Sequence, residues 1–105
     1  MQNNESHKLL MSLKSLASPV RLLILSALKT PLGFPEQVDG DREVDGICAD
    51  FIRERVSLSA ATVSRHLSLL AGAGLLIATR RKGWTFYRRD EDAILRFVQN
   101  LAKEI

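Results

Sequence analysis

The chain has 105 residues, a formal net charge of +3 and a hydrophobic content of 46%. Its length suits one small domain spanning residues 1–105, and its hydrophobic share argues against disorder along the whole chain. A single cysteine, Cys48, excludes an internal disulfide and a metal site built from several cysteines. No apolar run approaches the ~18 residues that span a bilayer, and the polar start does not resemble a signal peptide. We therefore expect a cytoplasmic protein without a membrane partner.

Charge is segregated along the chain. Residues 31–46 carry five acids and one base, a net of −4, whereas residues 53–89 carry eight bases and one acid, a net of +7. A basic half beside an acidic loop indicates that one face of the protein meets a polyanion. The alternative is a solvated charged surface, and the position of the bases relative to the helices decides between the two.

Two helices are expected at the N-terminal end. In Asn4–Leu16, leucines recur at helical spacing, and the helix is short enough to need docking on its own core or on a second copy. Ser18-Pro19 then starts a second helix, with serine as the N-cap and proline in the first turn. Apolar residues follow at helical spacing up to Leu28, and Thr30-Pro31 ends the helix.

A long loop is expected over Pro31–Gly46, which holds two prolines, three glycines and most of the acid. A short strand at Glu43–Ile47 is a further option, and a third helix is expected over Ile47–Arg55. Cys48 lies near the start of that helix and shares a face with Phe51. We favour core packing for this thiol, and redox sensing by Cys48 is the alternative.

The helix that follows combines an apolar stripe with a small, basic face. Ser59 can cap it, and Val63, Leu67 and Leu70 share one side. The opposite side presents Ala60, Ala61, Ser64, Arg65 and Ser68. Small residues allow close approach to a large surface, and arginine and serine can hydrogen-bond there, as a helix in the DNA major groove requires. Helix, short break and basic helix form the helix-turn-helix arrangement.

A cationic hairpin is expected next, from Leu75–Arg81 and Trp84–Arg88 joined by Lys82-Gly83. We expect its tip to carry Arg80, Arg81, Lys82, Arg88 and Arg89. Such a wing can lie along the phosphate backbone or in the minor groove. Trp84 and Phe86 alternate onto one face of their strand and are expected in the core.

The last helix is expected over Asp90–Ile105. Acidic residues stand in its first turn, where they favour the helix dipole. One side is apolar and is formed by Ile94, Leu95, Val98, Leu101 and Ile105.

In order and spacing, three segments together resemble the ArsR/SmtB family of bacterial winged-helix repressors. They are LASPVRLLILSAL at Leu16–Leu28, LSAATVSRHLSLLAGAGLL at Leu58–Leu76 and RRKGWTFYRRD at Arg80–Asp90. The resemblance covers roughly Leu9 to Leu101. It implies a mainly α, winged helix-turn-helix fold with about five helices and a two-stranded β-hairpin wing. It further implies a homodimer that represses transcription from an imperfect palindrome in double-stranded promoter DNA until an inducer binds.

The resemblance also implies which residues contact DNA. They are Ser59, Ala60, Thr62, Ser64, Arg65 and His66 in the helix, and Arg80, Arg81 and Lys82 in the wing. His66 lies at the edge of the apolar stripe and serves equally well as a packing residue. Ala60 and Ala61 depart from the family pattern, which removes a bidentate adenine contact, so we assign more of the binding to Arg65 and the wing. Dimerisation is implied for the first and last helices, here through Leu9, Leu10, Leu13, Ile94, Val98 and Leu101.

The metal sites of the family do not carry over. One needs a Cys-x-Cys pair where this chain has only Cys48, and the other needs an Asp-x-His start where this chain reads Asp90-Glu91-Asp92. We therefore expect no metal and no cofactor. The sequence does not name an inducer, and constitutive repression without a ligand is an option.

Two other classes of protein are alternatives. A winged helix can be a protein–protein interaction module, which would not need the +7 segment. An enzyme is disfavoured, because we find no paired carboxylates in an expected cleft, no Ser/His/Asp set and no glycine-rich phosphate loop. Ser64 and His66 stand two apart on one helix and so point away from each other.

Overall fold

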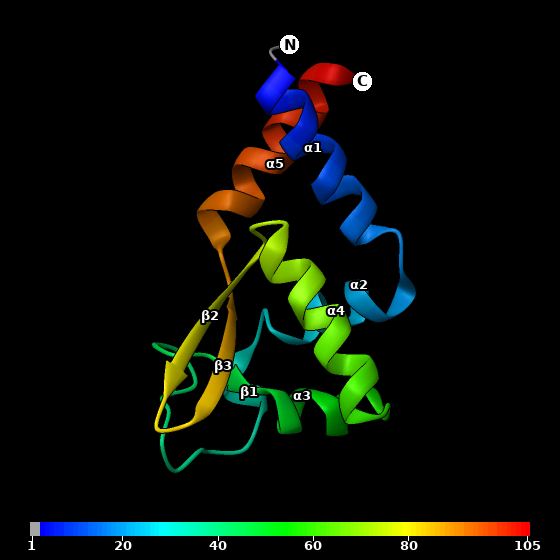
Figure 1. The fold of residues 1–105 in the computed structure, drawn as a ribbon. Coiled ribbons are helices and arrows are strands. Elements are labelled where there is room, and N and C mark those ends of the chain that lie inside the picture. Colours follow the sequence, from blue (N-terminus) through cyan, green and yellow to red (C-terminus); the bar gives the residue numbers. More distant parts are fainter. Residues whose placement is uncertain (1–2) are drawn as a thin grey trace.

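The computed structural model describes residues 3–105 and is drawn in Figure 1. The elements, in chain order, are α1 (Asn3–Leu16), α2 (Pro19–Ala27), a 3-10 turn η1 (Pro31–Gly33), β1 (Ile47–Cys48), α3 (Ala49–Val56), α4 (Ala60–Gly72), β2 (Leu76–Arg81), β3 (Trp84–Arg89) and α5 (Glu91–Glu104). Helices α1 and α5 pack side by side at one end of the molecule, and α3 and the hairpin lie at the other (Figure 1). The expected winged helix-turn-helix is confirmed.

The helix ends follow the capping residues of the sequence. The Ser18 side chain accepts the Arg21 backbone N–H at 3.3 Å at the start of α2, and Asp90 accepts the Ala93 N–H at 3.0 Å at the start of α5. These bonds satisfy helix N-terminal donors that would otherwise lack a partner. After α4 the chain turns at Gly74, whose φ of +81° lies in the left-handed region that favours glycine.

The sheet has three antiparallel strands in the order β1-β3-β2, so one short strand joins the two of the expected wing. The optional strand at Glu43–Ile47 overlaps this β1 only at Ile47. Ile47 and Cys48 pair with Tyr87 and Phe86, and α3 therefore starts at Ala49 rather than Ile47. Gly46 makes this pairing possible. Its φ is +106°, and a Cβ there would lie 2.3 Å from the Tyr87 carbonyl oxygen, so the two backbones can approach only at a glycine.

The core lies between α2, α3, α4 and the sheet. The predicted stripe of α4 is confirmed, because Val63, Leu67 and Leu70 are at most 1% exposed. The prediction of a core position holds for Phe86, which is 1% exposed, but is wrong for Trp84, which is 45% exposed. Trp84 is the first residue after the hairpin turn, where the core no longer reaches the strand.

Two arginines expected at the wing tip lie instead at the root of the hairpin. The two-residue turn sets Arg88 opposite Ile77 and Arg89 opposite Leu76, at the end of the strands that joins α5. The Arg89 guanidinium donates to the Leu25 carbonyl at 3.0 Å and pairs with Glu91 at 2.8 Å. It thus anchors the hairpin to α2 and α5, and the tip keeps Arg80, Arg81 and Lys82.

Within residues 3–105, no single helix is long and apolar enough to cross a membrane. Helices α1 and α2 meet that test only as a pair, and they are bent by 94° at the break between them.

Candidate nucleic-acid interface

The outer face of α4 is exposed and carries one free cation. Ala60, Ala61, Ser64 and Arg65 all lie at the surface. In the described part of the chain, Arg65 forms no ion pair. Its guanidinium is therefore available to an anionic partner, and the small neighbours leave the surface around it open.

At the start of α4, two of the predicted contact residues bind each other. The Ser59 hydroxyl accepts the Thr62 backbone N–H at 3.2 Å and donates to the Thr62 hydroxyl oxygen at 2.8 Å. This pair fixes the first turn of the helix. Both side chains stay exposed, and the positive end of the helix dipole favours a phosphate at this place.

His66 is half-buried and has a protein partner. Its Nδ1 lies 3.0 Å from Nη1 of Arg21, which also donates to backbone carbonyls at the end of α1, those of Lys14 and Ser15. Burial lowers the pKa of His66 below its usual value of 6.5, and the charges of Arg21 and Arg65 act in the same direction. The neutral ring can therefore accept the hydrogen bond from Arg21. This bridge between α1, α2 and α4 gives His66 a structural role, and any contact of His66 with DNA stays a prediction.

The hairpin turn presents three cations in different surroundings. Lys82 and Gly83 both have positive φ, 52° and 83°, as a tight two-residue hairpin turn requires. Arg80 is exposed and makes no ion pair with any residue from 3 to 105. Arg81 and Lys82, by contrast, are both paired with acids of the preceding loop. Only one of the three tip cations is thus free from the outset.

The acidic loop, residues 34–46, folds against this tip (Figure 1). Arg81 donates to the Asp45 carboxylate at 3.0 Å, and the Lys82 ammonium lies 3.7 Å from Asp39. The Asp45 side chain is only 7% exposed and also accepts the Asp41 N–H at 2.8 Å. The loop therefore offsets part of the wing's positive charge, a contact that the charge count could not reveal.

Gln37 fastens the loop to the sheet and was missed by the sequence reasoning. Its amide donates to the Gly46 carbonyl at 2.9 Å, and its side-chain oxygen accepts the Cys48 N–H at 2.7 Å. No pattern in the sequence marks Gln37, because both partners are backbone groups that only the fold brings near.

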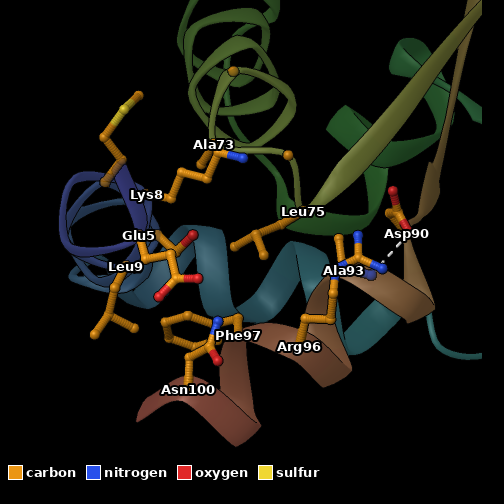
Figure 2. Close-up of a pocket in the computed structure, with 14 residues that line it drawn as sticks. Glu5, Lys8, Leu9, Ala73, Leu75, Asp90, Ala93, Arg96, Phe97 and Asn100 are labelled. Atoms are coloured by element: carbon orange, nitrogen blue, oxygen red, sulfur yellow. Dashed lines mark hydrogen bonds between the residues drawn. The ribbon is translucent and has the colours of Figure 1, made fainter. Parts of the chain in front are cut away.

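The predicted dimer residues lie on α1 and α5, at the end away from the wing. Leu10, Leu13 and Val98 are 50%, 37% and 52% exposed, whereas Leu9, Ile94 and Leu101 are half-buried. A hollow of about 540 Å³ lies between α1, the turn after α4 and α5. The apolar Leu75 and Phe97 line it together with charged groups, as Figure 2 shows. These charges have both signs: Glu5, Lys8, Asp90 and Arg96.

Cys48 is 5% exposed and stands at the N-cap of α3, which agrees with core packing. Among residues 3–105, no group of three His, Cys, Asp or Glu side chains lies close enough to hold a metal ion.

A helix-turn-helix whose second helix exposes a small, basic face, followed by a hairpin with cations at its turn, defines a winged-helix DNA-binding protein. No protein-family model matches the chain. The chain is 36% identical over 93 residues to the HTH-type transcriptional regulator YbzH of Bacillus subtilis (strain 168). The matched segment covers 88% of this chain and 93% of that protein.

Solved structures show the same fold. An ArsR-like transcriptional regulator from Rhodococcus sp. RHA1 has a TM-score of 0.71 at 18% identity, covering 95% of this chain and 81% of its own. The homodimeric winged helix-turn-helix DNA-binding domain of a possible ArsR-family regulator from Mycobacterium bovis scores 0.66 at 24% identity, covering 99% and 89%. HlyU from Vibrio cholerae scores 0.63 at 26% identity, covering 96% and 97%. The chain therefore belongs to the HTH-type transcriptional regulators, and it shares the winged helix-turn-helix fold of solved ArsR-family regulators.

Proposed function

We propose that the protein is a homodimeric repressor that binds an imperfect palindrome in promoter DNA. The observation that carries this proposal is the exposed Arg65, unpaired among the described residues, on a face of α4 whose other side chains are small. Two copies related by a two-fold axis would present two such helices to successive major grooves of the duplex, about one helical turn apart.

Each predicted contact residue has a place in this proposal. Arg65 reads a base edge or a phosphate, Ser64 and Thr62 donate from their hydroxyls, and the N-terminus of α4 at Ser59 and Ala60 meets a phosphate. Arg80 contacts the backbone or the minor groove directly. Arg81 and Lys82 exchange Asp45 and Asp39 for phosphate oxygens as the wing binds.

DNA binding is tested by fluorescence anisotropy on the region upstream of the protein's own gene, over a range of salt. Affinity should fall steeply with salt, and Arg80→Ala should reduce the slope of log K against log salt by about one, because one phosphate contact is lost. Lys103→Ala on α5 removes the same charge far from the wing and should leave the slope unchanged. A protein-interaction module would show no salt-dependent DNA binding, and that result would overturn the proposal.

Dimerisation is tested by sedimentation equilibrium on Val98→Asp. Val98 is 52% exposed in the single chain, so aspartate there costs the monomer little, but a carboxylate buried between two α5 helices would be strongly unfavourable. We expect a monomer and an affinity for the palindrome at least about a hundredfold lower, because two half-sites are no longer bound together. Val44→Asp makes the same change at a site that is 70% exposed in the acidic loop and should remain dimeric. A dimeric Val98→Asp protein would place the interface elsewhere.

A further inference from the structure

A second cavity lies at the other end of the molecule, between the acidic loop, α3 and β3. Its volume is about 220 Å³, and three aromatic residues, Phe51, Trp84 and Phe86, contribute to its lining. Four carboxylates line it as well: Glu36, Asp39, Asp50 and Glu54. No lysine or arginine is among the lining residues. In a chain whose net charge is +3, this is a local reversal of sign.

The loop that forms one wall is held in place by the fold. Gln37, which lines the cavity, binds the Gly46 carbonyl and the Cys48 N–H. Gly40 lies directly on the Phe86 ring, since a Cβ at Gly40 would come within 2.4 Å of that ring. The wall is therefore built before any ligand arrives, which lowers the entropic cost of binding.

The carboxylates around the cavity are weakly neutralised. Three have a basic neighbour beyond hydrogen-bond distance: Glu36 with Arg42 at 3.7 Å, Asp39 with Lys82 at 3.7 Å, and Asp50 with Arg53 at 3.9 Å. Glu54 makes no ion pair within residues 3–105. Long ion pairs with at least one solvent-exposed partner contribute little to stability, so these carboxylates remain available to a further cation.

We propose that this cavity binds a small organic cation, an ammonium or guanidinium group that carries an apolar substituent. Aromatic faces attract cations through their quadrupole, and the surrounding carboxylates add to that attraction. The apolar part of such a ligand would cover the aromatic lining, whereas a bare metal ion would find no group of three ligating side chains in the described part of the chain. The volume lies below the usual range for drug-sized ligands, which favours a compact molecule.

Trp84 allows a direct test, because it is the single tryptophan of the chain and lines the cavity. Its emission is recorded while benzyltrimethylammonium is added to the full-length protein without DNA. Benzenesulfonate and benzyl alcohol, an anion and a neutral molecule of similar size, serve as control ligands. We expect a saturable change with the cation alone. Because no DNA is present, the absence of cation binding would not contradict the repressor proposal. Likewise, the absence of DNA binding would not contradict the cation site.

Charge-neutral variants separate this site from a general effect. In Glu36→Gln/Glu54→Gln, two exposed carboxylates of the cavity become amides, and affinity for benzyltrimethylammonium should fall about tenfold at low ionic strength. Glu43→Gln/Glu104→Gln makes the same change in net charge at exposed sites that do not line the cavity, and should bind as the unaltered protein does. Equal responses to all three ligands, or full affinity in the cavity variant, would overturn the proposal.

Discussion

The exposed face of α4 and the tip of the wing both carry arginine toward the expected DNA, but they stand in different electrostatic surroundings. Arg65 on α4 has no acidic partner within residues 3–105, whereas Arg81 and Lys82 at the tip face Asp45 and Asp39. The helix is ready to meet a phosphate or a base. Two of the three wing cations, Arg81 and Lys82, first have to give up contacts with their own chain. Counting charges along the sequence therefore overstates what the wing offers.

The two acidic contacts of the wing also differ from each other. Asp45 is 7% exposed, touches Arg81 at 3.0 Å and holds a backbone N–H, so its carboxylate belongs to the fold. Asp39 is 26% exposed and lies 3.7 Å from Lys82, a distance and exposure typical of a weak surface pair. DNA can displace the second contact more easily than the first. We therefore expect Lys82 to join Arg80 on the phosphate backbone before Arg81 does.

Among substitutions on the α4 face and the wing, the largest effect is expected for Arg65→Ala. Loss of a guanidinium that contacts DNA should cost ~1–3 kcal/mol, or roughly a fivefold to 150-fold fall in affinity measured by anisotropy on the palindrome. Arg65→Lys keeps the charge but not the planar fork, so it should recover binding to any sequence but not the preference for the palindrome. If Arg65→Ala costs less than Arg80→Ala, the wing rather than α4 carries the binding.

The next largest effect is expected for Asp45→Asn. It should change both the stability of the fold and the salt dependence of DNA binding. The amide keeps the shape but loses the charge that faces Arg81, so the free energy of unfolding in urea should fall by about 1–2 kcal/mol. At the same time Arg81 is released, and the salt slope of DNA binding should steepen by about one. Asp39→Asn, the more exposed partner, is the comparison and should change stability less. An unchanged slope in Asp45→Asn would show that Arg81 does not reach the phosphates.

The helix faces, helix caps and hairpin turn could be predicted from the sequence, because each depends on interactions between residues close together in the chain. The stripe of α4, the Ser18 and Ser59 caps and the Lys82-Gly83 turn each depend on residues within a few positions of one another. Contacts between segments that are far apart in the chain could not be predicted from the sequence. Arg21 and His66 are 45 positions apart, and nothing in either neighbourhood marks the other.

The errors have the same origin. Strand β1 is only two residues long and exists because β3 pairs with it, so the optional strand at Glu43–Ile47 overlaps it only at Ile47. The misplacement of Arg88 and Arg89 arose from treating bases near the hairpin as bases at its turn, although the pairing register sets them against Ile77 and Leu76. The cations at the tip of the wing could be predicted from the sequence, but not the acidic partners, Asp45 and Asp39, that offset the charges of Arg81 and Lys82.

The smallest effect is expected from pH, through the bridge between Arg21 and His66. Burial, together with the charges of Arg21 and Arg65, lowers the pKa of His66 below its usual 6.5 in the folded protein, while the unfolded chain keeps the usual value. Between these two values the unfolded chain binds more protons, so stability falls as pH drops. The stability that the neutral His66 contributes is fully present above pH 6.5, and it is lost as the pH falls through the lower pKa of His66 in the folded protein.

The measurement is the thermal midpoint at pH 7.5 and 5.5, where we expect a fall of no more than about 2 °C at the lower pH. Asp41 and Glu91 add little in this window, because the Val44 and Glu43 N–H groups hold the pKa of Asp41 below its usual value and Arg89 does the same for Glu91. His66→Gln can still accept from Arg21 but does not titrate, so its midpoint should lose the dependence, whereas His7→Gln should keep it. A dependence that survives in His66→Gln would mean that the bridge to Arg21 is not its source.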